Sequence, residues 1–117
     1  MTDEDLWYFT HNGFYRGAEL LPDELIDRLN VATDRQIEIG EPPIVRENRD
    51  EPITPGNIRR ISKILTRDPV YLEAAQHPII LDALESILGP NIELVTNKHN
   101  HMMIRPGHSY PVPWHSG

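Results

Sequence analysis

Apolar residues recur at helical spacing through the first part of the chain. Leu25, Leu29 and Ala32 repeat every three to four positions, and charged side chains occupy the opposite side. This pattern predicts an amphipathic helix from about residue 22 to 38. Its apolar face needs a core to pack against.

The same spacing returns after a proline-rich stretch from Gly40 to Gly56, which predicts a long loop. Ile58, Ile61 and Leu65 predict a further helix from 57 to 66. Four basic side chains share one face of this predicted helix: Arg59, Arg60, Lys63 and Arg67. We interpret that basic face as solvated surface and assign it no role.

Capping residues mark the ends of the other predicted helices. Thr2 caps a first short helix that ends at Asn12-Gly13. Asp68-Pro69 and His77-Pro78 each place a proline at the first position of a helix, and Gly89-Pro90 stops the last and most apolar one. The chain is therefore expected to form about five helices before residue 90.

After Gly89 the pattern changes to two-residue alternation, which predicts a strand. One face would carry Glu93, Val95, Asn97, His99, His101 and Met103. The other would carry Leu94, Thr96, Lys98, Asn100, Met102 and Ile104. A strand with histidines on one side is typical of the inner wall of a binding barrel, although an exposed edge strand has the same pattern.

Helices followed by strands predict an α+β fold. We expect one partial domain over residues 1–117, with a helical part at 1–90 and the first strands of a sheet at 91–117. Two strands cannot cover their own edges, so these edges are expected to permit self-association. Further strands are expected beyond Gly117.

The composition narrows the function classes. The net charge of −7 argues against nucleic acid and anionic membranes as partners and leaves a small-molecule substrate. The chain has no apolar run of about 18 residues, and its acidic start is unlike a signal peptide, so a cytoplasmic location is expected. The absence of cysteine excludes disulfides and thiolate metal sites.

Histidines supply the candidate metal chemistry, since four of the six lie between Asn97 and Gly117. His115 stands at the end of an extended segment, which is where a β-barrel commonly places a metal ligand. A structural or surface histidine would give the same pattern. His99 and His101 are two residues apart, a spacing that can bind zinc or copper. The sequence contains no phosphate loop, nucleophile elbow or HExxH helix.

Several motifs occur in a defined order along the chain. The first half carries Phe9, Asn12-Gly13-Phe14 and Pro22-Asp23-Glu24-Leu25. The second half carries His77-Pro78-Ile79, Gly89-Pro90, Ile104-Arg105-Pro106-Gly107 and Trp114-His115-Ser116. In order and spacing they resemble the phytanoyl-CoA dioxygenase-like family of iron(II) and 2-oxoglutarate-dependent oxygenases. The likeness to the ectoine hydroxylase branch of this family is close.

The resemblance implies a double-stranded β-helix, or jelly roll, that holds Fe(II) on two histidines and one carboxylate and binds 2-oxoglutarate on the metal. It implies that His115 is the first iron ligand and that His99 faces the co-substrate. The second histidine and the arginine that binds 2-oxoglutarate are expected beyond Gly117. The 117-residue chain alone is therefore expected to be inactive and to bind iron weakly.

Gly117 departs from the family pattern, in which a carboxylate stands two residues after the first histidine. Three interpretations stay open. The protein is a hydroxylase of an unactivated C–H bond that takes its carboxylate from elsewhere, or a halogenase in which the small residue lets chloride bind the iron. The third is a non-catalytic, cupin-like metal or interaction module.

Overall fold

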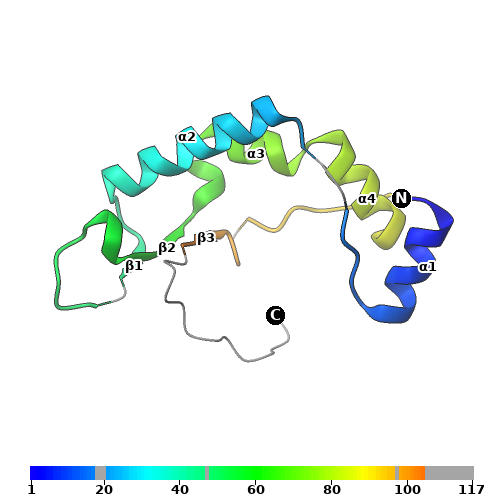
Figure 1. Cartoon of the computed structure of the whole chain (residues 1–117), viewed down its shortest axis with the longest axis horizontal. Coiled ribbons are helices and arrows are strands. Elements are labelled where there is room, and N and C mark those ends of the chain that lie inside the picture. Colours follow the sequence, from blue (N-terminus) through cyan, green and yellow to red (C-terminus); the bar gives the residue numbers. More distant parts are fainter. Residues whose placement is uncertain (18–20, 47, 97, 105–117) are drawn as a thin grey trace.

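The computed structural model describes residues 1–17, 21–46, 48–96 and 98–104 (Figure 1). It contains the α-helices α1 (Asp3–Asn12), α2 (Asp23–Ile39), α3 (Pro69–Ala75) and α4 (Pro78–Leu88). It also contains the strands β1 (Ile44–Arg46), β2 (Ile58–Ser62) and β3 (His101–Met103), with short 3-10 turns η1 (Pro55–Asn57) and η2 (Ile64–Thr66). The described part of the chain therefore has the predicted α+β class.

The predicted helix ends are confirmed where local hydrogen bonds define them. Asp5 N donates to the Thr2 hydroxyl over 3.2 Å, and Thr2 N donates to the Asp5 carboxylate over 2.9 Å. This capping box lowers the pKa of Asp5, chiefly through the backbone hydrogen bond. Asp68 caps α3 by accepting from Val70 N at 3.0 Å, and Gly13 ends α1 at a φ of 76°.

β2 is the central strand of an antiparallel sheet with the order β1-β2-β3. Ile61 stands opposite Ile44 on one side and Met102 on the other. Ile44 and Met102 are both packed against the buried core, so this set of partners faces inward. The register thereby fixes which side of the sheet is the core side.

The predicted helix from 57 to 66 is wrong, because this segment forms β2 and η2. The register between β1 and β2 shifts after Val45: Val45 pairs with Arg60, whereas the next residue pairs with Ile58. Arg59 is thus an extra residue, as in a β-bulge. The bulge allows Ile58 and Ile61, three residues apart, to be buried together at 1% and 0% exposure. The bulge therefore gives two apolar residues of a strand the three-residue spacing that is typical of a helix.

The four basic side chains of that segment consequently do not share a helical face. Arg59 and Arg60 lie on β2, Lys63 has a left-handed backbone with a φ of 58°, and Arg67 follows η2. The helical part predicted at 1–90 also contains β1 and β2, and β1 lies within the predicted long loop.

The strand predicted from about 93 to 104 is shorter than expected, because only His101–Met103 pairs in the sheet among the described residues. His99 has a φ of 51°, a left-handed conformation that interrupts the two-residue alternation. His99 therefore does not belong to the same strand face as His101, contrary to the prediction.

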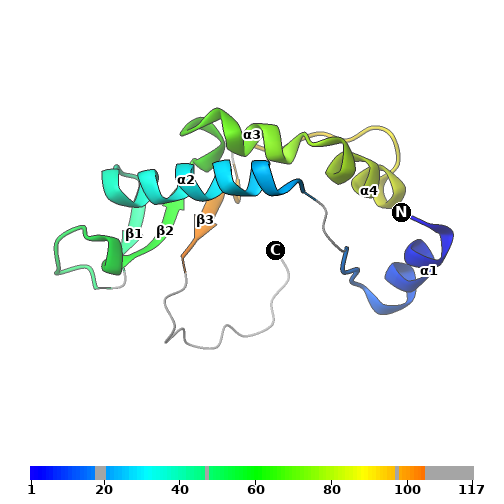
Figure 2. The ribbon, with the colours of Figure 1, turned by 45° about the horizontal axis from the view of Figure 1, so that its top comes forward.

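The core lies between the sheet and the helices α2 and α3, which run along one side of the strands (Figures 1 and 2). Its buried apolar residues are Leu25, Ala32, Ile58, Ile61, Ile64, Val70 and Tyr71. Arg28 on α2 binds the Glu73 carboxylate of α3 at 2.8 and 2.5 Å, and its hydrogen bonds lower the pKa of Glu73. Both side chains are half exposed, so the pair contributes little to the stability of the fold.

α1 and α4 take no part in this core, since neither contributes a buried residue. The described residues contain no helix with the length and apolar character needed to cross a membrane.

We expect Ile61→Ala to lower the free energy of unfolding by about 2–4 kcal/mol, because a fully buried side chain would leave a cavity at the centre of the sheet. Urea denaturation measures this loss. Val31→Ala is the matched control, since Val31 is 70% exposed, and a change below about 0.5 kcal/mol is expected there. Equal losses in both variants would contradict the position of the core.

Candidate functional site

The sheet face that points away from the core carries the candidate site. Arg60 stands opposite Val45 and Met103, and Ser62 stands opposite His101. Since Arg60 and Ser62 flank the inward-facing Ile61 on β2, their side chains lie on the outer face. The predicted separation of His101 and Met103 from Met102 is confirmed within β3.

Backbone hydrogen bonds place these outer residues close together. Ile104 N donates to Arg59 O over 2.9 Å, and Lys63 N donates to Asn100 O over 2.7 Å. These bonds make Arg59–Ile104 and Lys63–Asn100 hydrogen-bonded pairs. Because hydrogen-bonded and non-hydrogen-bonded pairs alternate along antiparallel strands, Arg60–Met103 and Ser62–His101 are non-hydrogen-bonded pairs. Opposite side chains approach most closely in such pairs. Arg60 and His101 are diagonal neighbours within reach of a long side chain.

One polar atom on this face lacks a partner. Arg60 Nε is buried, and no hydrogen-bond acceptor in the described part of the chain reaches it. Met103 beside it is 53% exposed, which leaves an accessible apolar surface next to a buried cationic donor.

His99, the residue expected to face the co-substrate, lies just before β3 and is exposed. Its ring centroid is 6.0 Å from that of His101, and the two rings are tilted by 40°. His101 N donates to His99 O over 3.0 Å, which closes a tight turn between them. The two predicted neighbours are therefore close in space, although they do not lie on one regular strand.

Asn100 holds this turn in place. Its side-chain oxygen accepts from Leu65 N at 3.0 Å, and its amide nitrogen donates to Thr96 O at 3.0 Å. Asn100 thereby ties the start of β3 to η2 and positions the histidines on either side. Sequence alternation gave no reason to single out Asn100, because its partner Leu65 is distant in the chain.

His115, the predicted first iron ligand, lies outside the described residues, as do Trp114 and Gly117. Within the described ranges, no cluster of three histidine, aspartate or glutamate side chains could hold a metal ion. His99 and His101 supply two imidazoles and no carboxylate. They are short of the three-ligand set that iron(II) takes in oxygenases, so a complete site needs donors from outside these ranges.

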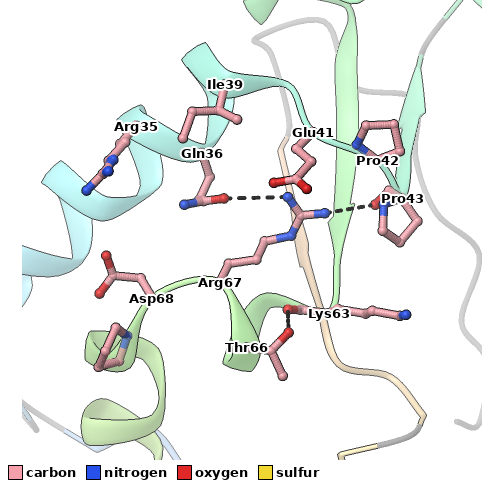
Figure 3. Close-up of a pocket in the computed structure, with 11 residues that line it drawn as sticks. Arg35, Gln36, Ile39, Glu41, Pro42, Pro43, Lys63, Thr66, Arg67 and Asp68 are labelled. Carbon is pink, nitrogen blue, oxygen red and sulfur yellow. Dashed lines mark hydrogen bonds between the residues drawn. The ribbon is translucent and has the colours of Figure 1, made fainter.

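A hollow lies between the end of α2, residues 41–43 and the start of α3 (Figure 3). It is a cleft of about 570 Å³ whose basic residues include Arg67. Arg67 Nε donates to Ser62 O over 2.8 Å, and its terminal nitrogens lie 3.5 Å from Gln36 Oε1 and Pro43 O (Figure 3). The guanidinium joins three segments, so we assign Arg67 a structural role.

Comparison with protein-family models, with curated proteins and with solved structures found no match for this chain.

We expect Asn100→Ala to lower the free energy of unfolding by about 1–2 kcal/mol, because Leu65 N would lose its acceptor in a partly buried position. Urea denaturation measures the loss, and side-chain NMR of His99 and His101 is expected to show that both rings move. Asn91→Ala is the control, since Asn91 is exposed and has no such contact. Unchanged histidine resonances in Asn100→Ala would contradict the positioning role.

Proposed function

We propose that this chain is the front part of a non-haem Fe(II) and 2-oxoglutarate-dependent dioxygenase that hydroxylates an unactivated C–H bond of a small organic substrate. The resemblance of the ordered motifs, ending in Trp114-His115-Ser116, suggests this activity. The observation that supports it best is the outer face of the sheet, where His101 and Arg60 lie opposite the helical layer.

The proposed fold of the whole enzyme is a jelly roll. The described sheet is antiparallel throughout, and α2 and α3 pack against its core side (Figure 1). These two features support the proposal, because a jelly-roll sheet covered by helices on its outside would have both. In this proposal α2 and α3 cover the outside of the wall. The face with Arg60, Ser62 and His101 lines the interior.

In the proposed enzyme His115 is the first iron ligand, while the second histidine and the arginine for 2-oxoglutarate follow Gly117. When bound, the iron would supply the hydroxylation chemistry with dioxygen as the oxidant and 2-oxoglutarate as the co-reductant, which is converted to succinate and carbon dioxide. The residues of this chain form one wall of the cavity, orient the substrate and exclude water. His99 contacts the co-substrate from the turn before β3.

Anaerobic addition of Fe(II) and 2-oxoglutarate to the full-length protein is expected to produce a visible metal-to-ligand charge-transfer band. We expect His115→Ala to weaken iron binding by about 10-fold or more, because it removes a direct ligand. Absorption titration measures both. His11→Ala is the control, since His11 lies on α1, exposed and stacked on Trp7.

A full-length protein without this band would contradict the dioxygenase and favour the non-catalytic module. An equal loss of iron affinity in His115→Ala and His11→Ala would contradict the assignment of His115 as a ligand.

The glycine at position 117 specifically favours a second candidate, a non-haem iron halogenase. If chloride occupies the position of the missing carboxylate, chloride is expected to shift the charge-transfer band of the parent protein. In Gly117→Asp the new carboxylate competes for that position, and the shift is expected to disappear. Spectral titration with chloride measures both.

Gly56→Asp is the matched control, because a Cβ atom added at this position meets no atom within 4 Å. We expect it to keep the chloride response of the parent. A parent protein that does not respond to chloride would exclude the halogenase and leave the hydroxylase.

A further inference from the structure

The outer face of the sheet contains a cationic group, Arg60, one of whose hydrogen-bond donors is unsatisfied within the described residues. Burying a donor without an acceptor costs about 1–3 kcal/mol, and buried polar groups in folded proteins are nearly always satisfied. Arg60 Nε is buried and lacks an acceptor among the described residues. This donor therefore points to an acceptor that the described residues do not supply.

Other arginines of the chain have found oxygen acceptors. Arg28 binds the Glu73 carboxylate, Arg46 donates to Glu51 O, and Arg67 donates to Ser62 O. Each of these guanidinium groups contributes to the fold through its acceptor. Arg60, on the outer side of the central strand, differs from these three in having a buried nitrogen without an acceptor among the described residues.

The residues around Arg60 define what would fit. Ser62 and His101, a non-hydrogen-bonded pair, add a hydroxyl and an imidazole to the same face. A neutral or protonated imidazole can donate at least one hydrogen bond. A planar guanidinium with two such neighbours matches the two oxygens of a carboxylate, and its single charge balances a single negative charge. Met103 and Val45 opposite Arg60 supply apolar contact for a hydrocarbon body.

We propose that this face binds the carboxylate group of a small organic acid through Arg60, with Ser62 and His101 as further donors. That this face is a substrate site rests on the proposed oxygenase function. The substrate of that oxygenase would then be an organic acid whose carboxylate is bound by residues of β2 and β3. Arg60 is then a specificity-determining residue. The hydrocarbon part lies over Met103.

The test uses the ¹⁵N-labelled 117-residue chain and hexanoate as the probe, without iron or 2-oxoglutarate. Backbone amide shifts are followed in a titration. Saturable shifts are expected at Arg60, Ser62, His101 and Met103. Hexylamine, which has the same hydrocarbon chain and the opposite charge, is expected to cause no saturable shift. Inorganic phosphate is expected to bind at least about tenfold more weakly than hexanoate.

Three variants give the test its specificity. Arg60→Met removes the guanidinium and is expected to weaken hexanoate binding by about tenfold or more. Arg60→Lys keeps the positive charge but lacks the planar guanidinium group, so an affinity between those of the parent and Arg60→Met is expected. If Arg60→Met does not fold, Arg60→Lys still tests whether the guanidinium contributes to binding. Arg49→Met removes an exposed arginine from the loop before β2 and is expected to bind like the parent.

The proposal is overturned if no saturable shift occurs, if phosphate binds as tightly as hexanoate, or if neither Arg60 variant weakens binding. Because iron is absent, this result is separate from the charge-transfer experiment. Arg60-dependent binding in a protein without the band would keep the carboxylate site and reject the oxygenase. The band without hexanoate binding would keep the oxygenase and reject this site.

Discussion

Burial of the inner face of β2 is the constraint on which the rest of the described structure depends. β2 is the strand that pairs on both sides, and Ile61, which stands opposite Ile44 and Met102, has no exposed surface. Once Ile61 faces the helices, the strand geometry turns its neighbours Arg60 and Ser62 to the other side. Pairing with β1 and β3 then extends the same division of faces to the whole sheet. The core and the candidate site are thus two sides of one strand.

The sequence predicted those features that depend on contacts within a few residues. Thr2 with Asp5, and Asp68 with Val70, form helix caps over two or three residues, and both were recognisable as patterns. The class α+β followed from helices and alternation in the same way. β2 could not be recognised, because its strand identity depends on partners far away in the chain, and its bulge gives Ile58 and Ile61 the spacing of a helix.

The candidate site was predictable only in part, for a related reason. Alternation placed His101 and Met103 on one face correctly, since these residues form a regular strand. It failed at His99, where the backbone is left-handed and Asn100 bonds to Leu65 instead of continuing a ladder. The apolar spacing predicts Arg60 on the solvated face of a helix, and an unpaired buried nitrogen has no signature in a sequence. Long-range pairing decided each of these points.

The bulge at Arg59 connects the stability of the core with the chemistry of the outer face. In a regular strand Ile58 would share the side of Arg60 and Ser62, because residues two apart point the same way. Ile58 belongs instead to the buried cluster. One extra residue thus adds a large apolar side chain to the core and removes it from the face where Arg60 lies. Deleting Arg59 would place Ile58 two residues before Ile61, so a regular strand would then bury both isoleucines and keep Arg60 on the outer face; with Arg59 present, only the bulge makes this division of faces possible.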